Sequence, residues 1–250
     1  MWPYPRVLAH RGGGSLAPEN TVAALRCGLA YGYAAVEFDV MLSKDGVPVL
    51  MHDPDFGRTV PGRGRVADTA AADLLKMDAG AWFGAAFAGE TVPAYASVVQ
   101  FCRQHGIWMN VEIKPSPGAE VATGRVVAEV ARDLFADVPL AEVSRRPLLS
   151  SFSFDALMAA KLAAPGLPRG LLMSRVGADW RARLQSLDAV ALHTNHQNLN
   201  EKTAREIKAA GYGLFCYTVN SLERASEITA WGVDGFCTDR IDLIPAHFAP

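Results

Sequence analysis

Short apolar runs alternate with longer amphipathic segments along most of the chain. The runs have the length and composition of buried strands, and the segments repeat apolar residues with the period of a helix. We therefore expect strands over residues 7–9, 36–40, 108–114, 148–152, 170–173, 189–193, 214–219 and 235–239. We expect helices over residues 94–104, 120–135, 155–163, 179–187, 201–210 and 222–231, and an earlier helix that begins at Pro18–Thr21 with Asn20 as its N-cap.

Repeated strand–helix units of this length predict a parallel sheet with helices outside it. The number of strands fits an α/β fold of the (β/α)8 TIM-barrel class, and a doubly wound open sheet is the alternative. The glycine-rich run Gly12–Gly14 follows the first strand but does not match the GxGxxG pattern, which argues against a dinucleotide-binding fold. We expect residues 1–250 to form a single barrel domain.

Two segments interrupt this alternation. The Ser43–Gly46 run is typical of a hairpin turn, so residues 47–53 are expected to return antiparallel to the second strand and to carry His52 back toward Asp39. Residues 54–90 are rich in glycine, alanine and aspartate and include a short predicted helix over residues 69–77. This segment is too short to bury a core of its own, so we interpret it as a small insertion packed over the barrel.

The second strand carries two acids two residues apart. Side chains alternate faces along a strand, so Glu37 and Asp39 point one way while Val36, Phe38 and Val40 point the other. Two carboxylates on a buried face require a counter-charge. Basic side chains or a hard cation would supply it.

More polar residues are expected at the same end of the barrel. The next predicted strand ends with Glu112 and Lys114 on one face, and the first strand runs into His10 and Arg11. Chemistry in a barrel of this class sits at the carboxyl ends of its strands, so these side chains and His52 should converge there. A purely structural salt-bridge network is the alternative, but three acids would then meet two fixed cations, Arg11 and Lys114.

The residue types favour a metal-assisted phosphate site. The all-carboxylate set Glu37, Asp39 and Glu112 suits Mg²⁺ or Ca²⁺ better than zinc. Arg11 offers a bidentate fork to a phosphate group and Lys114 a point charge. His10 and His52 can act as general acid and base. The expected cofactor is therefore one divalent cation.

Other polar residues near the predicted strand ends have weaker support. Ser151 and Tyr217 are candidate substrate contacts, with His193 considered beside them. Asp53 and Asp239 are expected to bond loop amides in a structural role. Asn110 lies one layer below Glu112 and is expected to fill the barrel interior.

Composition narrows the function further. The chain has 250 residues and a formal net charge of -2, with acids and bases interspersed, so it lacks the basic patch of a nucleic-acid-binding protein. The four cysteines are widely spaced and favour free thiols in a reducing compartment. The N-terminal segment resembles no secretory signal, and no run approaches a membrane span. These features predict a cytoplasmic protein with no membrane partner, and they leave a homodimer open.

Motifs along nearly the whole chain resemble the glycerophosphodiester phosphodiesterase family. They are Ala9–Gly12, Pro18–Thr21, Glu37–Asp39, Ser43–Gly46, His52–Asp53, Glu112–Lys114, Ser151–Phe152, Tyr217–Asn220, Gly232–Gly235 and Thr238–Asp239. The first residues look most like those of the cytosolic bacterial members associated with glycerol-3-phosphate uptake. Many members carry Trp where this chain has Tyr217, which could alter contacts at the barrel mouth.

The resemblance implies a TIM-barrel hydrolase that cuts glycerophosphodiesters, the deacylated head groups of phospholipids, to sn-glycerol 3-phosphate and an alcohol. It implies metal ligation by Glu37, Asp39 and Glu112. It also implies acid–base roles for His10 and His52, and phosphate binding by Arg11 and Lys114. The expected partner is a small glycerophosphodiester substrate.

Two other functions are compatible with these residues. A binding protein for sugar phosphates or phospholipid head groups could keep the barrel without turnover. A phospholipase D-like enzyme acting on intact lipids would require an exposed apolar rim. For the hydrolase we expect attack on phosphorus by the substrate's own glycerol hydroxyl through a cyclic intermediate, with direct attack by water as the alternative.

Overall fold

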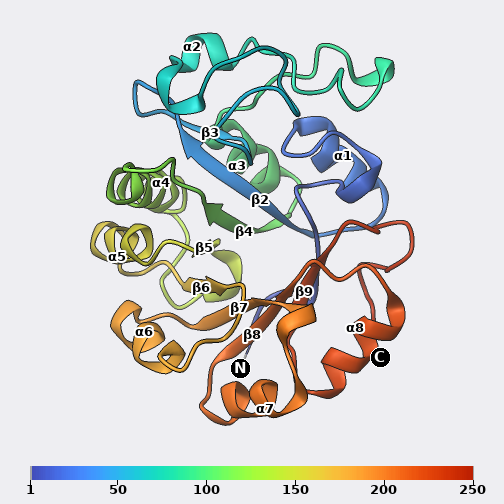
Figure 1. Ribbon diagram of the computed structural model, residues 1–250, viewed down its shortest axis with the longest axis vertical. Coiled ribbons are helices and arrows are strands. Elements are labelled where there is room, and N and C mark those ends of the chain that lie inside the picture. Colours follow the sequence, from blue (N-terminus) through green and yellow to red (C-terminus); the bar gives the residue numbers. More distant parts are fainter. Residues whose placement is uncertain (1, 250) are drawn as a thin grey trace.

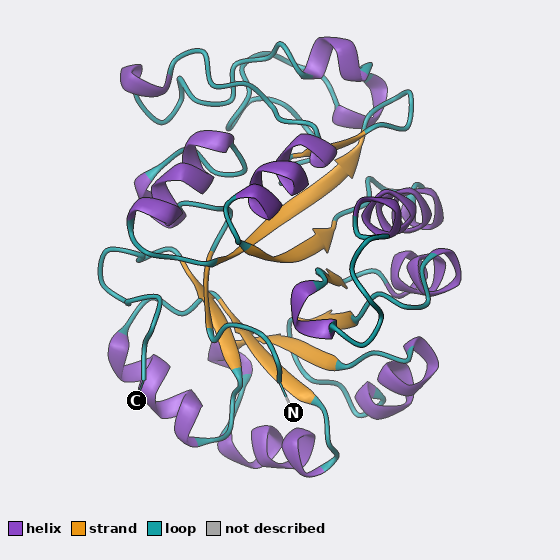
Figure 2. Ribbon diagram, turned by 180° about the vertical axis from the view of Figure 1, so that it is seen from behind, coloured by secondary structure: helices purple, strands orange, loops and turns teal. Residues whose placement is uncertain are grey.

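The computed structural model describes residues 2–249, and within this range eight parallel strands close into a barrel surrounded by helices (Figures 1 and 2). The barrel strands are β1 (Val7–Ala9), β2 (Ala35–Leu42), β4 (Trp108–Ile113), β5 (Leu148–Ser151), β6 (Arg169–Met173), β7 (Ala191–Asn195), β8 (Gly213–Tyr217) and β9 (Gly235–Thr238). The α-helices are α1 (Val22–Ala30), α2 (Ala71–Leu74), α3 (Tyr95–Gln104), α4 (Glu120–Leu134), α5 (Phe154–Ala163), α6 (Trp180–Leu187), α7 (Glu201–Ala209) and α8 (Leu222–Ala230).

Strand β1 closes the barrel. It pairs in parallel with β9 on one side and with β2 on the other, and Ala9 is in register with both Thr238 and Val36. An open sheet would leave β1 or another strand with a free edge, so this pairing confirms the (β/α)8 barrel and excludes the doubly wound alternative. It also brings the two ends of the chain together at one site.

The predicted hairpin is present at the edge of this barrel. Strand β3 (Pro48–Leu50) pairs antiparallel with the end of β2, where Val40 is opposite Leu50. On its other side β2 pairs in parallel with β4, which places Asp39 beside Glu112. The hairpin therefore returns the chain to the rim at His52, as the turn residues predict.

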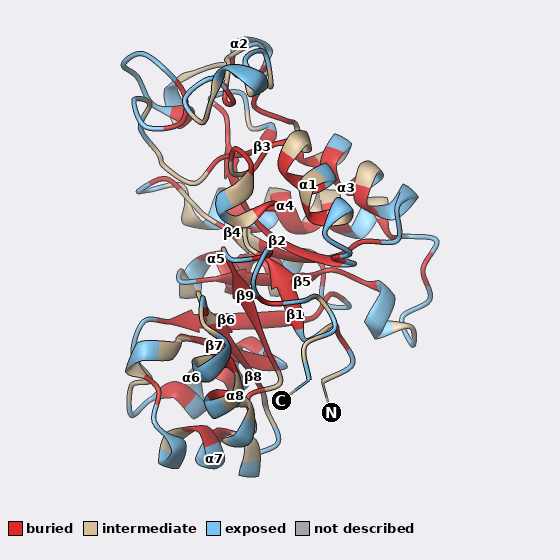
Figure 3. Ribbon diagram, turned by 90° about the vertical axis from the view of Figure 1, so that its right-hand side faces the viewer, coloured by how far each residue is buried: buried red, intermediate tan, exposed pale blue. Residues whose placement is uncertain are grey.

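Each barrel strand separates an outer apolar face from an inner face. Val36, Phe38 and Val40 join the main core between strands and helices, as the alternation predicts, and Figure 3 shows the strands buried inside a more exposed helical shell. The amino-terminal end of the interior is filled by an aromatic cluster of Trp2, Tyr4, Leu8, Ala35, Trp108, Leu148, Phe215 and Cys237. Polar chemistry is thereby confined to the opposite, carboxyl end of the barrel.

The segment between β3 and α3 packs over the β2–β3 hairpin. Its apolar side chains Val60, Val66 and Leu74 share a small core with Met41 and Val49 of the hairpin. The sequence predicts one short helix over residues 69–77, and the helix present within this range is shorter. The structure has a 3₁₀ turn (Val66–Asp68) and the short helix α2.

Side chains that capture backbone amides explain the shorter helix. The Asp45 carboxylate accepts a hydrogen bond from the Ala71 amide at the start of α2. Beyond the helix, the Asp78 carboxylate accepts from the amides of Gly80, Ala81 and Gly89 and folds the chain into a loop.

Within residues 2–249, no helix is both long and apolar enough to cross a membrane.

Candidate active site

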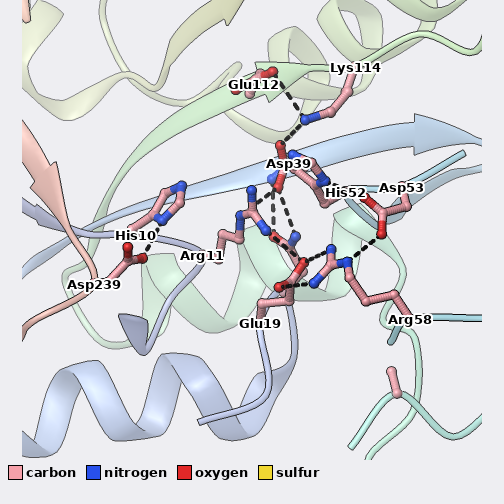
Figure 4. A network of polar contacts seen from close by, with 12 residues as sticks. His10, Arg11, Glu19, Asp39, His52, Asp53, Arg58, Glu112, Lys114 and Asp239 are labelled. Atoms are coloured by element: carbon pink, nitrogen blue, oxygen red, sulfur yellow. Dashed lines mark hydrogen bonds and ion pairs between the residues drawn. The ribbon is translucent and has the colours of Figure 1, made fainter. Parts of the chain in front are cut away.

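A cavity of about 170 Å³ opens at the carboxyl ends of β1, β2 and β4. Its rim is formed by His10, Arg11, His52 and Lys114, and its walls continue inward past Glu37 and Glu112. Figure 4 shows polar side chains from β1, β2, β4 and the β3 hairpin converging here, among them those of His10, Asp39, His52 and Glu112. The structure therefore brings together the candidate residues that the sequence places at these strand ends.

The three candidate metal ligands form one cluster. Glu37 and Asp39 point inward from β2, Glu112 points inward from β4, and an oxygen from each lies within 4.8 Å of the others. Burial, with the charge of Asp39, raises the pKa of Glu37 to about 7 and that of Glu112 to about 8. Asp39 is 1% exposed, but the charges of Lys114 and Arg11 outweigh this burial and lower its pKa.

This donor set fits a hard divalent cation. Buried carboxylates that raise one another's pKa lack sufficient positive charge around them. Lys114 Nζ lies 3.4 Å from Asp39 Oδ1 and 3.8 Å from Glu112 Oε1, and Arg11 Nε lies 3.5 Å from Asp39 Oδ2. The structural salt-bridge network is thus present, but its long contacts leave the carboxylate charge incompletely balanced. Clustered carboxylate oxygens are the ligands that Mg²⁺ and Ca²⁺ prefer.

Each candidate histidine is held by an aspartate. His10 Nδ1 lies 2.6 Å from Asp239 Oδ1, and His52 Nδ1 lies 2.6 Å from Asp53 Oδ1. A carboxylate can only accept, so Nδ1 carries the proton in each pair and Nε2 is left for other contacts. His10 Nε2 lies 3.7 Å from Glu37 Oε2.

The expected role of both aspartates is therefore corrected. Within residues 2–249, the carboxylates of Asp239 and Asp53 accept from no loop amide; they hold the two histidines instead. Asn220 Nδ2 supports Asp239 by donating to its other oxygen at 3.0 Å. His52 and Asp53 are neighbours in the sequence, so their pairing could be predicted from the sequence alone. Asp239 is 229 positions from His10, and only barrel closure joins them.

The two histidines differ in charge preference. Burial disfavours the charged form of His10, but the hydrogen bond that His10 donates to Asp239 and the charge of Glu37 outweigh it and raise the pKa. Burial, with the charges of Arg11 and Lys114, lowers the pKa of His52 despite the opposing effect of Asp39. Two imidazoles with opposite tendencies on one cavity are suited to general acid–base chemistry.

The loop after β1 has a backbone that few side chains tolerate. Arg11 has a left-handed φ of 52°, and Gly14, with φ of 56°, approaches Asp239 so closely that a Cβ would lie 2.2 Å from its carbonyl oxygen. Gly28 of α1 makes room for the same loop, since its Cβ would lie 2.4 Å from the Gly12 carbonyl oxygen. These glycines fix the loop that presents His10 and Arg11.

Asn20 has a different role from the one expected. The sequence predicts it as the N-cap of α1, but Thr21 caps the helix by accepting from the Ala24 amide. Asn20 adopts φ of 59° and clamps Asp39, donating from Nδ2 to Asp39 Oδ2 at 2.9 Å and accepting from the Asp39 amide at 3.1 Å. It therefore orients a candidate metal ligand.

The inner part of the cavity contains polar atoms without protein partners. Among the atoms of residues 2–249, Asn110 Oδ1, Ser150 Oγ and both ring nitrogens of His193 are buried and make no hydrogen bond. These three residues line the cavity, next to apolar Leu172 and Phe215. Asn110 is buried in the barrel interior, as expected, and its side chain also lines the cavity, as does that of His193. A pocket that leaves such atoms unpaired is suited to a small polar ligand.

Ser151 and Tyr217 are placed differently from each other. Ser151 Oγ donates to the Ile113 carbonyl at 2.6 Å, and Ser150 lines the cavity in its place, so the geometry does not support substrate contact by Ser151. Tyr217 and Phe152 both line the cavity and pack edge to face. Ser150 was missed because a one-residue shift in strand register exchanges the inward and outward faces.

Comparison with protein families gives a match over residues 10–243 to the glycerophosphoryl diester phosphodiesterase family. A glycerophosphodiester phosphodiesterase of Caldanaerobacter subterraneus is 33% identical over 238 residues, covering 93% of each chain. A glycerophosphodiester phosphodiesterase of Bacillus subtilis is 28% identical over 252 residues, covering 94% of this chain and 84% of its own.

A solved structure is also similar. It is that of a phosphodiesterase from Oleispira antarctica in complex with the product sn-glycerol-3-phosphate. The two chains are 36% identical and superpose with a TM-score of 0.87, over 94% of this chain and 93% of the other. The similarity therefore extends over nearly the whole of both chains.

Proposed function

Because the chain belongs to the glycerophosphoryl diester phosphodiesterase family and is an enzyme of that family, we propose that it hydrolyses glycerophosphodiesters to sn-glycerol 3-phosphate and an alcohol. The product bound by the Oleispira protein supports this choice of product. The observation that carries the proposal is the grouping of three carboxylates and two aspartate-backed imidazoles around one cavity.

Glu37, Asp39 and Glu112 would hold one divalent cation, Mg²⁺ or Ca²⁺. Such an ion supplies Lewis acidity and neutralises the charge that develops on the phosphoryl oxygens. Arg11 and Lys114 also line the cavity and would provide positive charge for binding the phosphate. Asn20 holds Asp39 in place through its amide.

His10 and His52 divide the proton transfers between them. Asp239 and Asp53 hold Nδ1–H of the two rings, so that Nε2 of each can take or give a proton. The substrate's 2-hydroxyl attacks phosphorus, loses its proton to one imidazole, and the leaving alcohol oxygen takes a proton from the other. Water then opens the cyclic phosphate, with the two roles reversed, and releases sn-glycerol 3-phosphate.

The substrate enters with its glycerol end inward. The unpaired polar atoms of Asn110, Ser150 and His193 can hydrogen-bond glycerol hydroxyls, while the apolar sides of Leu172 and Phe215 face its carbon atoms. The departing alcohol then lies toward the mouth, beside Phe152 and Tyr217. This orientation makes recognition depend on the glycerol end that all these substrates share.

The decisive assay measures release of sn-glycerol 3-phosphate from glycerophosphocholine with a coupled dehydrogenase. The wild-type protein should turn over. His10→Gln and His52→Gln should each reduce kcat by roughly 10²–10⁴-fold, the usual contribution of a general acid or base. Tight binding of glycerophosphocholine without release would instead favour the binding-protein function.

Single-turnover ³¹P NMR distinguishes attack by the substrate hydroxyl from direct attack by water. A cyclic glycerophosphate signal is expected only for attack by the substrate hydroxyl.

A further inference from the structure

Arg58 links the insertion to two residues of the site without lining the cavity itself. Its Nε donates to Asp53 Oδ2 at 2.5 Å, and Nη1 and Nη2 donate to the two oxygens of Glu19, each at 2.7 Å (Figure 4). All three guanidinium nitrogens are therefore engaged with carboxylates. A single side chain of the insertion spans the β3 hairpin and the loop that precedes α1.

Both carboxylates continue to residues of the proposed reaction. The other oxygen of Asp53 holds His52 Nδ1 at 2.6 Å, and Glu19 Oε1 also accepts from Arg11 Nη1 at 2.8 Å. The result is a continuous chain of charged contacts from His52 to Arg11, with Arg58 at its centre. Removing Arg58 would leave Asp53 held only by His52 and Glu19 held only by Arg11, so that neither carboxylate would fix the orientation of its partner.

The exposure of Arg58 argues against a mainly stabilising role. Its side chain is 44% exposed, and solvent screens ion pairs at such exposure, so they contribute little to stability. The hydrogen bonds of Arg58 to Asp53 and Glu19 are nevertheless directional, and the pair with Glu19 is bidentate. Such bonds fix the orientation of the two carboxylates even where they add little to stability. A misplacement of about 1 Å in a reacting group can cost about 100-fold in rate.

We propose that Arg58 is a positioning residue, which orients His52 through Asp53 and Arg11 through Glu19, so that the insertion sets the geometry of proton transfer and phosphate binding together. The proposal rests on the proposed function for the roles of His52 and Arg11. In this proposal the insertion contributes to catalysis through Arg58, whose contacts lie outside the cavity.

Kinetics of Arg58→Gln and Arg58→Lys test the proposal, with Arg65→Gln as the matched control. Arg65 belongs to the same insertion and is 46% exposed, and its Nε lies 3.9 Å from Asp55. Arg58→Gln should lower kcat/KM about 10–100-fold, with kcat reduced and KM raised, while its melting temperature stays near that of wild type. Arg58→Lys should recover only part of this loss, because one ammonium cannot make three directed bonds. Arg65→Gln should match wild type.

Single substitutions separate the two arms of the chain of contacts. Asp53→Asn should act mainly on kcat, through His52, and Glu19→Gln mainly on KM, through Arg11. Combining Arg58→Gln with either should cost less than the sum of the two separate effects, because both remove the same connection. Kinetic constants of Arg58→Gln within twofold of wild type would overturn the proposal. A loss explained entirely by a smaller folded fraction would overturn it as well.

A second measurement decides the matter independently of turnover. The Nδ1 proton of His52, identified by its absence in His52→Gln, should give a protected ¹H–¹⁵N NMR signal in wild type and in Arg65→Gln. In Arg58→Gln this signal should broaden or disappear, while that of His10 persists. An unchanged His52 signal would contradict the proposal. A wild-type protein that released no sn-glycerol 3-phosphate would instead contradict the proposed function, and the NMR comparison would still test Arg58.

Discussion

The ring of His193 is buried beneath the candidate site. It is 1% exposed and packs on Phe215, and burial lowers its pKa to about 3. The folded protein therefore keeps this ring neutral at pH values where the unfolded chain, with a pKa near 6.5, binds a proton. Stability from this group is fully present above pH 6.5 and falls as the pH drops toward 3.

Urea unfolding at pH 7.0 and pH 5.5 tests this effect. Between these two values wild type should lose about 1 kcal/mol more unfolding free energy than His193→Leu, whose side chain cannot titrate. Other groups titrate in both proteins, so the difference between them isolates His193. Equal losses in the two proteins would show that His193 is not held neutral by the fold.

The carboxylate cluster opposes folding when no cation is bound. Because Glu37 is 5% exposed and lies against buried Asp39 and half-buried Glu112, Glu37→Gln should stabilise the metal-free protein. We expect its unfolding free energy to increase by about 1–2 kcal/mol and its melting temperature to rise. Adding Mg²⁺ or Ca²⁺ should stabilise wild type by about 2–3 kcal/mol at a hundredfold excess over Kd and leave Glu37→Gln nearly unchanged. Thermal unfolding with and without the ion measures both. If the ion stabilised wild type and Glu37→Gln equally, Glu37 would not be a ligand of the ion.

The sequence was sufficient for some of these residues and insufficient for others. Strand alternation alone places Glu37 and Asp39 on one inward face, and the structure confirms it. The partners Asp239 and Arg58 could not be predicted in the same way. Their roles depend on contacts with His10 and Glu19, residues that lie close only after the chain has folded.

At the scale of elements, close packing of α1 against the loop after β1 requires glycine at position 28. Alanine is intrinsically better than glycine in a helix by about 1 kcal/mol, but a Cβ at Gly28 would lie 2.4 Å from the Gly12 carbonyl oxygen. Gly28→Ala should therefore cost about 1–3 kcal/mol and lower activity by shifting His10 and Arg11. Gly84→Ala, where a Cβ would meet open space, is the control. Thermal unfolding and the release assay measure both effects, and a stabilised, fully active Gly28→Ala would show that the loop can move away freely.

Hydrophobic periodicity predicted the boundaries of helices and strands well wherever no side chain competes for the backbone amides. The strands and outer helices are close to their predicted ranges because each buries one apolar face. The insertion deviates because Asp45 and Asp78 bind backbone amides there, which hydrophobic periodicity does not register. The N-cap of α1 shifted by one residue because Asn20 is used to hold Asp39.

At the scale of the whole molecule, barrel closure assembles the site. The pairing of β1 with both β2 and β9 places His10 between Glu37 and Asp239, and the aromatic cluster around Trp2 fills the opposite end of the interior. The number of alternating strands favoured this closure over an open sheet, and the pairing of β1 with β2 decides it. Which inward side chains would meet inside the barrel depends on strand register, which the sequence left open by one residue at Ser150 and Ser151.

The most direct test of the central claim is the metal dependence of product release. Protein stripped with EDTA and dialysed should leave glycerophosphocholine intact, and stepwise addition of Mg²⁺ or Ca²⁺ should restore formation of sn-glycerol 3-phosphate, followed by ³¹P NMR. Asp39→Ala should stay inactive across the same titration, because it lacks one of the three clustered carboxylates. Undiminished release by wild type in the presence of EDTA would contradict the account.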